Sequence, residues 1–82
     1  MDNKNTYLTS SLPLASFLAY SGVPLLNVLK DKHSGKKIFE FERIDGLDDL
    51  LESYFRKSAR VEPETYFFVM KSLKARIYDF DG

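Results

Sequence analysis

The sequence contains no cysteine and a single histidine among its 82 residues. A chain without cysteine has no disulfide, no thiolate nucleophile and no thiolate metal site, which fits the reducing cytoplasm, the location we expect. One histidine excludes sites that need two, such as the HExxH zinc enzymes. His33 lies in a turn-like stretch with nothing to hold an imidazole rigid, so we expect an exposed loop residue. We therefore expect no enzyme activity, no catalytic residue, no metal and no cofactor.

Net charge is also absent, because 12 basic residues balance 12 acidic ones. This balance disfavours a protein that coats nucleic acid or an anionic membrane non-specifically. Residues 5–29 carry no charge and approach the length of a membrane span, but Pro13, Gly22 and Pro24 interrupt every apolar run. A secretory signal is the other interpretation, and Pro13 and Ser16 break its hydrophobic segment as well. We expect neither, and predict that this stretch forms the interior of the fold.

The length fits one domain over residues 1–82, with a polar tail at residues 1–5. Residues 6–9 and 25–29 are predicted strands, and residues 38–42 alternate apolar and acidic, so Phe39 and Phe41 should share one face. Ser34-Gly35 suits the turn of a β-hairpin between the last two strands.

Three helices complete the predicted order β-α-β-β-α-α, an α+β fold with a three-stranded, mainly antiparallel sheet packed against helices. The first helix starts after Ser10 or Ser11 and ends near Gly22. The second begins at Asp45. The third begins at Pro63. The apolar stripe of the second helix comprises Leu47, Leu50, Leu51, Tyr54 and Phe55, and that of the third comprises Tyr66, Met70, Leu73 and Ile77, flanked by Phe67 and Val69.

Residues in both halves of the chain together form a pattern that extends over about residues 7–78. The pattern comprises Tyr7-Leu8-Thr9-Ser10, Leu12-x-Leu14-Ala15-x-Phe17-Leu18, Gly22, Phe39-x-Phe41-Glu42, Leu47, Leu50, Tyr54, Val61, Phe67 and Leu73-Lys74-Ala75-x-Ile77-Tyr78. In these residues the chain resembles a family of small bacterial domains of unknown function. The resemblance implies a bacterial or phage origin and a compact α+β fold. It implies no activity, because the family has no assigned catalytic residues.

Lysines gather at the predicted hairpin tip, where only Asp31 opposes them. One interpretation is contact with phosphates or with an acidic protein patch. The other is a solvated turn that prevents pairing with neighbouring strands. The lysines concerned are Lys30, Lys32, Lys36 and Lys37.

Acidic residues crowd the stretch after the tip, relieved only by Arg43. Paired carboxylates can bind Mg²⁺ or act as acid and base, but acidic residues are also expected at a helix start. We favour the second interpretation, with a role in repelling nucleic acid from that face or in docking a basic partner. The residues are Glu40, Glu42, Asp45, Asp48, Asp49 and Glu52.

Phe68 lies opposite the apolar stripe of the last predicted helix, near Lys71 and Ala75. A large apolar side chain there is either covered by another part of the chain or exposed as a contact point. Phe68, Lys71 and Ala75 are therefore the candidate interface.

Together these patterns predict a small non-enzymatic protein–protein interaction or dimerisation module. The alternative is a nucleic-acid-associated accessory protein that contacts phosphates through the hairpin tip. We expect a protein partner or self-association and no membrane partner.

Overall fold

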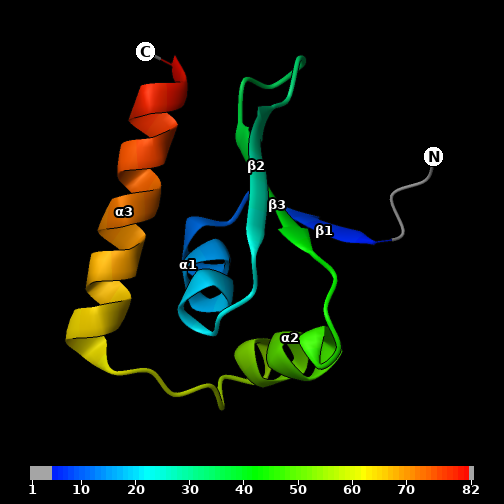
Figure 1. Cartoon of the computed structure of the whole chain (residues 1–82), viewed down its shortest axis with the longest axis vertical. Coiled ribbons are helices and arrows are strands. Elements are labelled where there is room, and N and C mark those ends of the chain that lie inside the picture. The colour runs from blue at the N-terminus through cyan, green and yellow to red at the C-terminus, as the bar shows by residue number, and fades with distance from the viewer. Residues whose placement is uncertain (1–4, 82) are drawn as a thin grey trace.

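The computed structural model describes the backbone of residues 5–81 and the side chains of residues 5–79 (Figure 1). Three strands form one antiparallel sheet in the order β1-β3-β2, and three helices pack around it, which confirms the predicted α+β fold and element order. The strands are β1 (Thr6–Thr9), β2 (Leu25–Lys30) and β3 (Lys37–Glu42), and the helices are α1 (Leu12–Tyr20), α2 (Leu47–Phe55) and α3 (Pro63–Asp81).

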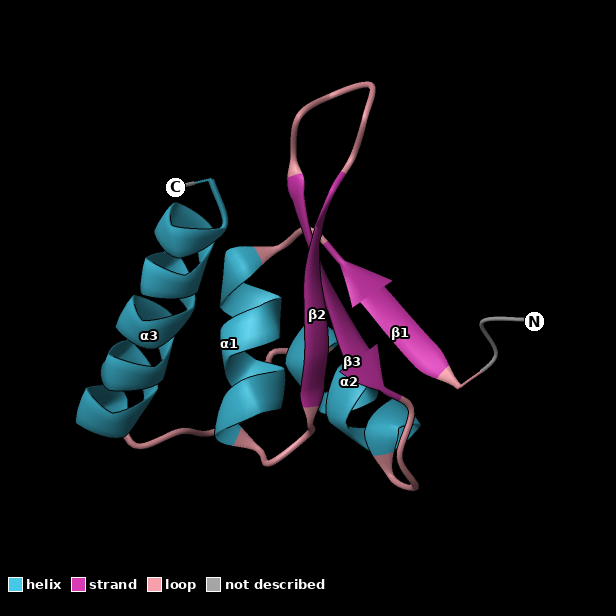
Figure 2. Cartoon of the chain, turned by 45° about the horizontal axis from the view of Figure 1, so that its top comes forward, coloured by secondary structure: helices cyan, strands magenta, loops and turns pink. Residues whose placement is uncertain are grey.

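The helices differ in how they meet the sheet (Figures 1 and 2). Helix α1 lies between the sheet and α3, and α3 packs mainly on α1. Helix α2 lies beyond the end of β3. One side of α3 therefore faces away from the rest of the molecule.

Strand β3 is the centre of the fold, because it pairs with both other strands. Phe39 and Phe41 are 1% and 0% exposed and point to the face that α1 covers, as the alternation predicts. Tyr7 opposes Phe41 on β1, and Val28 opposes Phe39 on β2. The strand pairing shifts register between Leu25 and Asn27, which leaves Leu26 outside the ladder.

Helix α1 is apolar on most sides and is almost completely enclosed, with residues 14–18 all buried. The Ser11 side chain caps its start by accepting a hydrogen bond from the Leu14 N–H at 3.2 Å. Gly22 follows its end with φ at 92°, the left-handed conformation expected after a helix. The prediction that the uncharged stretch forms the interior is therefore right for residues 14–18 and Val23, which are buried. It is wrong for the turns and strand positions that are exposed, such as Pro24, Leu26 and Leu29.

The hydroxyl of Ser16 is buried without a hydrogen-bond partner. Because an unpaired buried hydroxyl is destabilising, Ser16→Ala should raise the free energy of unfolding by about 1 kcal/mol. Urea denaturation followed by far-UV circular dichroism measures this change. Ser53→Ala is the control, because the Ser53 hydroxyl donates to the Leu50 carbonyl at 2.9 Å, and it should bring no gain. A loss of stability in Ser16→Ala would contradict the prediction.

Helix α2 departs from the prediction at its start and in the burial of its last residue. It begins at Leu47 rather than Asp45, because Gly46 adopts the left-handed conformation (φ 87°) and no side chain caps the start. Phe55, predicted in the core stripe, is 64% exposed and lies edge-on against Tyr54 at the end of the helix.

Helix α3 is fixed at its start by Glu62, whose carboxylate accepts hydrogen bonds from the Thr65 hydroxyl (2.6 Å) and backbone N–H (2.7 Å). These bonds, with one from the Glu64 N–H, hold the pKa of Glu62 below its ordinary value. The stabilisation they give is present above the ordinary carboxyl pKa and is lost as the pH falls through the lowered value. The Tyr20 hydroxyl accepts from the Glu62 N–H at 2.8 Å and joins this turn to α1.

Residues 1–5 were predicted to form a polar tail, and residues 1–4 of it lie outside the described residues. Asn5 is exposed, but its carbonyl accepts a hydrogen bond from the Arg43 N–H at 2.7 Å. Asn5 therefore extends the contact between β1 and the end of β3.

Candidate functional site

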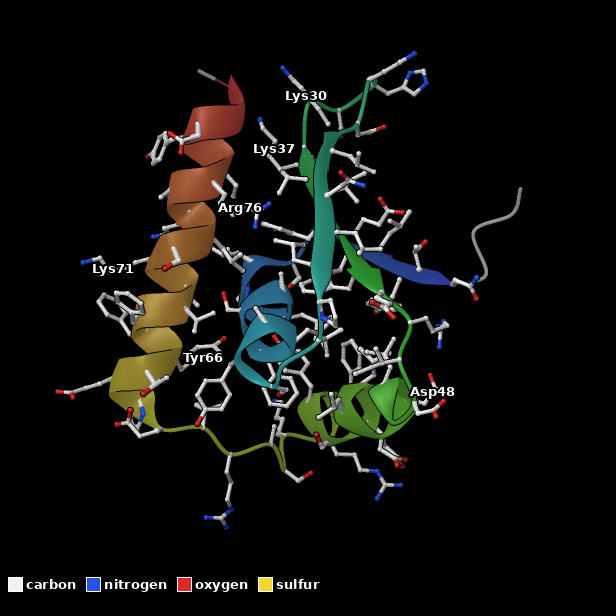
Figure 3. All side chains as sticks on the ribbon, viewed as in Figure 1. Lys30, Lys37, Asp48, Tyr66, Lys71 and Arg76 are labelled. Carbon is white, nitrogen blue, oxygen red and sulfur yellow. The ribbon has the colours of Figure 1, made fainter. Side chains whose placement is uncertain are left out.

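An exposed side of α3, next to the side that packs on α1, carries two aromatic residues and two lysines. Phe67, Lys71, Lys74 and Tyr78 are spaced three or four residues apart, which puts them on one side of the helix, here named the α3 outer face. All four are exposed, Phe67 by 61% and Tyr78 by 76%. The Lys71 ammonium lies 5.6 Å from the centre of the Phe67 ring, a cation–π contact. In Figure 3, Lys71 points away from the molecule.

A shallow groove follows the α3 outer face and is mainly apolar. Met70 and Ala75 complete its lining beside the four residues of the face. A second hollow adjoins it through Lys74 and Tyr78 and reaches Leu12 and Ile77. The groove thus offers an apolar floor with two ammonium groups in its lining.

The predicted interface residues Phe68, Lys71 and Ala75 are all exposed. Lys71 and Ala75 line the groove, whereas Phe68, 69% exposed, does not. Phe67 was predicted beside the core stripe, and this is wrong: one helical step of about 100° beyond Tyr66 carries it out of the contact with α1.

The basic hairpin tip projects beyond the rest of the molecule (Figure 2). Asp31 fixes its turn by accepting hydrogen bonds from the Ser34 hydroxyl (2.6 Å) and N–H (3.1 Å), and these bonds lower the pKa of Asp31. Lys30 and Lys37 are cross-strand partners. The structure therefore brings the predicted lysines to one end of the hairpin: Lys30, Lys32 and Lys36 are exposed, and Lys37 is half-buried. His33 is exposed, as expected of a loop residue.

The acidic residues are divided among separate elements. Glu40 accepts a hydrogen bond from the Asn27 side chain at 3.0 Å on the sheet. Asp48 pairs with Arg43 at 3.1 Å, and Glu52 pairs with Arg56 at 2.7 Å. Among residues 5–79, no group of three or more histidine, cysteine or acidic side chains is placed to hold a metal ion.

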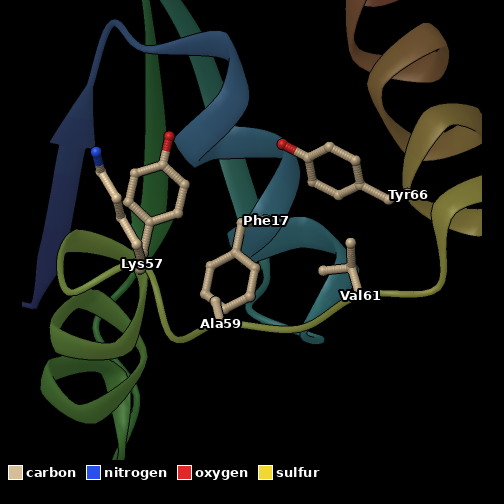
Figure 4. A pocket seen from close by; sticks show the side chains of 6 residues that line it. Phe17, Lys57, Ala59, Val61 and Tyr66 are labelled. Carbon is tan, nitrogen blue, oxygen red and sulfur yellow. The ribbon is translucent and has the colours of Figure 1, made fainter.

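A cavity between α1 and the 56–62 connector was not predicted (Figure 4). The Phe17 and Tyr54 rings lie 5.7 Å apart, and the Tyr66 hydroxyl donates to the Pro13 carbonyl at 2.8 Å. Burial raises the pKa of Tyr66. The lining of the cavity comes from four separate parts of the chain, so no local sequence pattern could have revealed it. The lining residues are Phe17, Tyr54, Lys57, Ala59, Val61 and Tyr66.

Lys57, which lines this cavity, holds a conformation that favours glycine, with φ at 63°. Its N–H donates to the Tyr54 carbonyl, and the Ser58 N–H donates to the Ser53 carbonyl, which together form a Schellman end to α2. Lys57→Gly should therefore raise the free energy of unfolding by about 1 kcal/mol. Thermal denaturation checks this, with Arg56→Gly as control: Arg56 is helical (φ −81°) and its replacement should destabilise. Equal effects of the two changes would refute the prediction.

No helix within the described part of the chain combines the length and apolar character needed to cross a membrane.

Comparisons with known proteins place the chain in a family. No curated protein matches it, and no solved structure matches it. A family model described as "Domain of unknown function (DUF5659)" matches residues 4–79, nearly the whole chain, which agrees with the resemblance seen in the sequence. The chain therefore belongs to the DUF5659 family.

Proposed function

We propose that this chain is a small, non-enzymatic protein–protein interaction module whose contact surface is the α3 outer face. The observation that carries the proposal is the exposure of Phe67 and Tyr78 beside a groove, on a helix whose adjacent side packs on α1. Aromatic residues are enriched at the centres of protein interfaces, because they remove much apolar area from water with little loss of side-chain entropy.

The chemistry of the groove also favours binding over catalysis. Its polar groups are the ammonium groups of Lys71 and Lys74 and the hydroxyl of Tyr78, all on one exposed helix side. Catalytic groups need to be held by packing and by supporting hydrogen bonds. Exposed lysines instead suit the selection and orientation of a partner with acidic groups.

The double substitution Phe67→Asp/Tyr78→Asp tests the proposal. Immobilised wild-type chain should retain a specific protein from an extract of the organism that encodes it, and the double variant should retain at least tenfold less, because each aspartate destroys apolar contact area. Quantitative mass spectrometry of the retained proteins measures the difference. Both baits must first give the same far-UV circular dichroism spectrum.

Leu26→Asp is the control, because Leu26 is 44% exposed on β2 and lies outside the strand ladder. It introduces the same kind of charge away from α3 and should leave retention unchanged. An equal loss of retention in Leu26→Asp and in Phe67→Asp/Tyr78→Asp would refute the proposed surface. So would a wild-type chain that retains no protein.

A second candidate function is contact with nucleic-acid phosphates through the hairpin tip, favoured by the exposure of Lys30, Lys32 and Lys36 at a projecting end. Fluorescence anisotropy with a 20-base-pair duplex should then show affinity that falls with salt, with a slope of about −0.9 per phosphate contact. Lys32→Glu/Lys36→Glu should abolish this binding. Binding that persists in this variant, or no binding by the wild type at low salt, excludes the candidate.

We further propose the cytoplasm as the compartment, because a chain without cysteine needs no oxidising environment to fold. The bacterial or phage origin implied by the resemblance remains a prediction.

A further inference from the structure

We propose that the partner of the α3 outer face is helix α2 of a second copy of the same chain. This inference rests on the proposed function and names the partner. The contact surface on α2, here named the α2 outer face, comprises Asp48, Glu52 and Phe55. The contact is head-to-tail, because each copy would use two different surfaces.

The α2 outer face has the spacing of a single helix side, since its residues are four and three positions apart. The side chains of Asp48 and Glu52 are 85% and 56% exposed, and Phe55 is 64% exposed. Asp49, also exposed, adds a third carboxylate next to this side. The face therefore joins an exposed aromatic ring to at least two carboxylates.

The two faces match in charge and in scale. Lys71 and Lys74 are three residues apart and Asp48 and Glu52 are four, which corresponds to about 4.5 and 6 Å along the helix axes. The aromatic ends of the α3 outer face span about 16 Å and the α2 outer face about 10 Å, so the shorter face fits within the longer one. Phe55 can then enter the apolar groove while the carboxylates meet the ammonium groups, a helix-in-groove contact.

The geometry favours a second copy over a contact within one chain. Lys71 and Asp48 point outward from opposite sides of the molecule (Figure 3). A symmetric contact between two α3 outer faces would bring lysines against lysines, and like charges at an interface are unfavourable. The α2–α3 contact instead joins opposite charges.

The existing ion pairs of α2 do not oppose this contact. Arg43 and Arg56 hold Asp48 and Glu52 in exposed pairs, which are worth little in water. Lys71 and Lys74 have no ion pair with any of the residues that the structure describes. Carboxylates have acceptor positions for a second cation, so the contact extends the pairs rather than breaking them.

Light scattering coupled to size-exclusion chromatography tests the inference on the full chain. Between about 20 µM and 1 mM the average mass of the wild type should rise above the 9.5 kDa of one copy, because a head-to-tail contact adds copies as concentration increases. The variants Lys71→Glu/Lys74→Glu and Asp48→Lys/Glu52→Lys should each stay monomeric. In the first variant the α2 and α3 outer faces are both acidic, and in the second they are both basic, so copies of one variant repel each other. An equimolar mixture of the two variants should associate again.

Two controls keep the outcomes distinct. Lys32→Glu/Lys36→Glu changes the net charge as much as the α3 variant does, and it should associate like the wild type. If Asp48→Lys/Glu52→Lys loses its circular dichroism signal, Asp48→Asn/Glu52→Gln replaces it and should weaken association at least tenfold.

A wild type that stays monomeric up to 1 mM overturns the second-copy inference. So does a mixture that fails to associate, or a face variant that associates like the wild type. None of these results refutes the proposed function, which is tested separately by the capture experiment with the Phe67→Asp/Tyr78→Asp variant.

Discussion

Replacing Phe41 with alanine should lower the free energy of unfolding by about 3 to 5 kcal/mol. Phe41 is completely buried on the central strand, where it lies between Tyr7 on β1 and Leu25 on β2. Truncation removes most of an aromatic side chain and leaves a cavity that three paired strands cannot close. A domain of this length has a total stability of about 4 to 12 kcal/mol, so the variant should lose a large fraction of it.

Urea denaturation followed by far-UV circular dichroism measures the loss. The matched control is Phe68→Ala, which removes the same atoms from a side chain that is 69% exposed and should change stability by less than about 0.5 kcal/mol. A loss below 1 kcal/mol for Phe41→Ala would show that the core does not centre on β3.

Replacing Leu73 with alanine should have the second largest effect, a loss of about 2 to 4 kcal/mol. Leu73 is 4% exposed and is the one residue of α3, among those whose side chains are described, that is fully buried in the core. Helix α3 meets the rest of the fold mainly through α1, so the Leu73 side chain contributes much of the packing that holds α3 in place.

Hydrogen exchange distinguishes a loosened helix from general unfolding. In Leu73→Ala the amides of α3 should lose protection before those of β3, because the change weakens the α1–α3 contact and leaves the sheet intact. Lys74→Ala is the control, since Lys74 is exposed and its replacement should preserve protection. Simultaneous loss of protection in α3 and β3 would contradict this account.

The sequence predicted the fold well where local patterns determine structure. Alternation in residues 38–42 identified the buried face of β3, and Ser11, Gly22 and Pro63 marked helix ends through well-understood backbone preferences. These signals depend only on neighbouring residues. The element order could therefore be predicted without any knowledge of packing.

Positions that depend on where helices end or cross were predicted less well. Phe55 and Phe67 fit an apolar helix period, yet both are exposed, because α2 projects beyond the sheet and α1 covers only one side of α3. Of the three residues predicted as an interface, Lys71 and Ala75 line the groove on α3 and Phe68 does not, and the groove itself was not predicted. Which aromatic residues are exposed is decided by tertiary contacts, and the helical period alone does not give them.

The net charge of zero also gains meaning from the structure. Basic residues lie on the α3 outer face and at the hairpin tip, and acidic ones at α2, so the balance is between separate surfaces. Separate surfaces of opposite sign are what an oriented contact between copies needs.

A concentration series of ¹⁵N-labelled wild-type chain, followed by amide chemical shifts, tests the role of the α3 outer face most directly. Between 20 µM and 1 mM the account predicts progressive shifts at residues 67–78 of α3 and 48–55 of α2, with residues 31–36 unchanged. Shifts confined to the hairpin tip would contradict this prediction. So would the absence of shifts at both helices, if they stay unchanged in the concentration series and also when the protein captured by the wild-type bait is added.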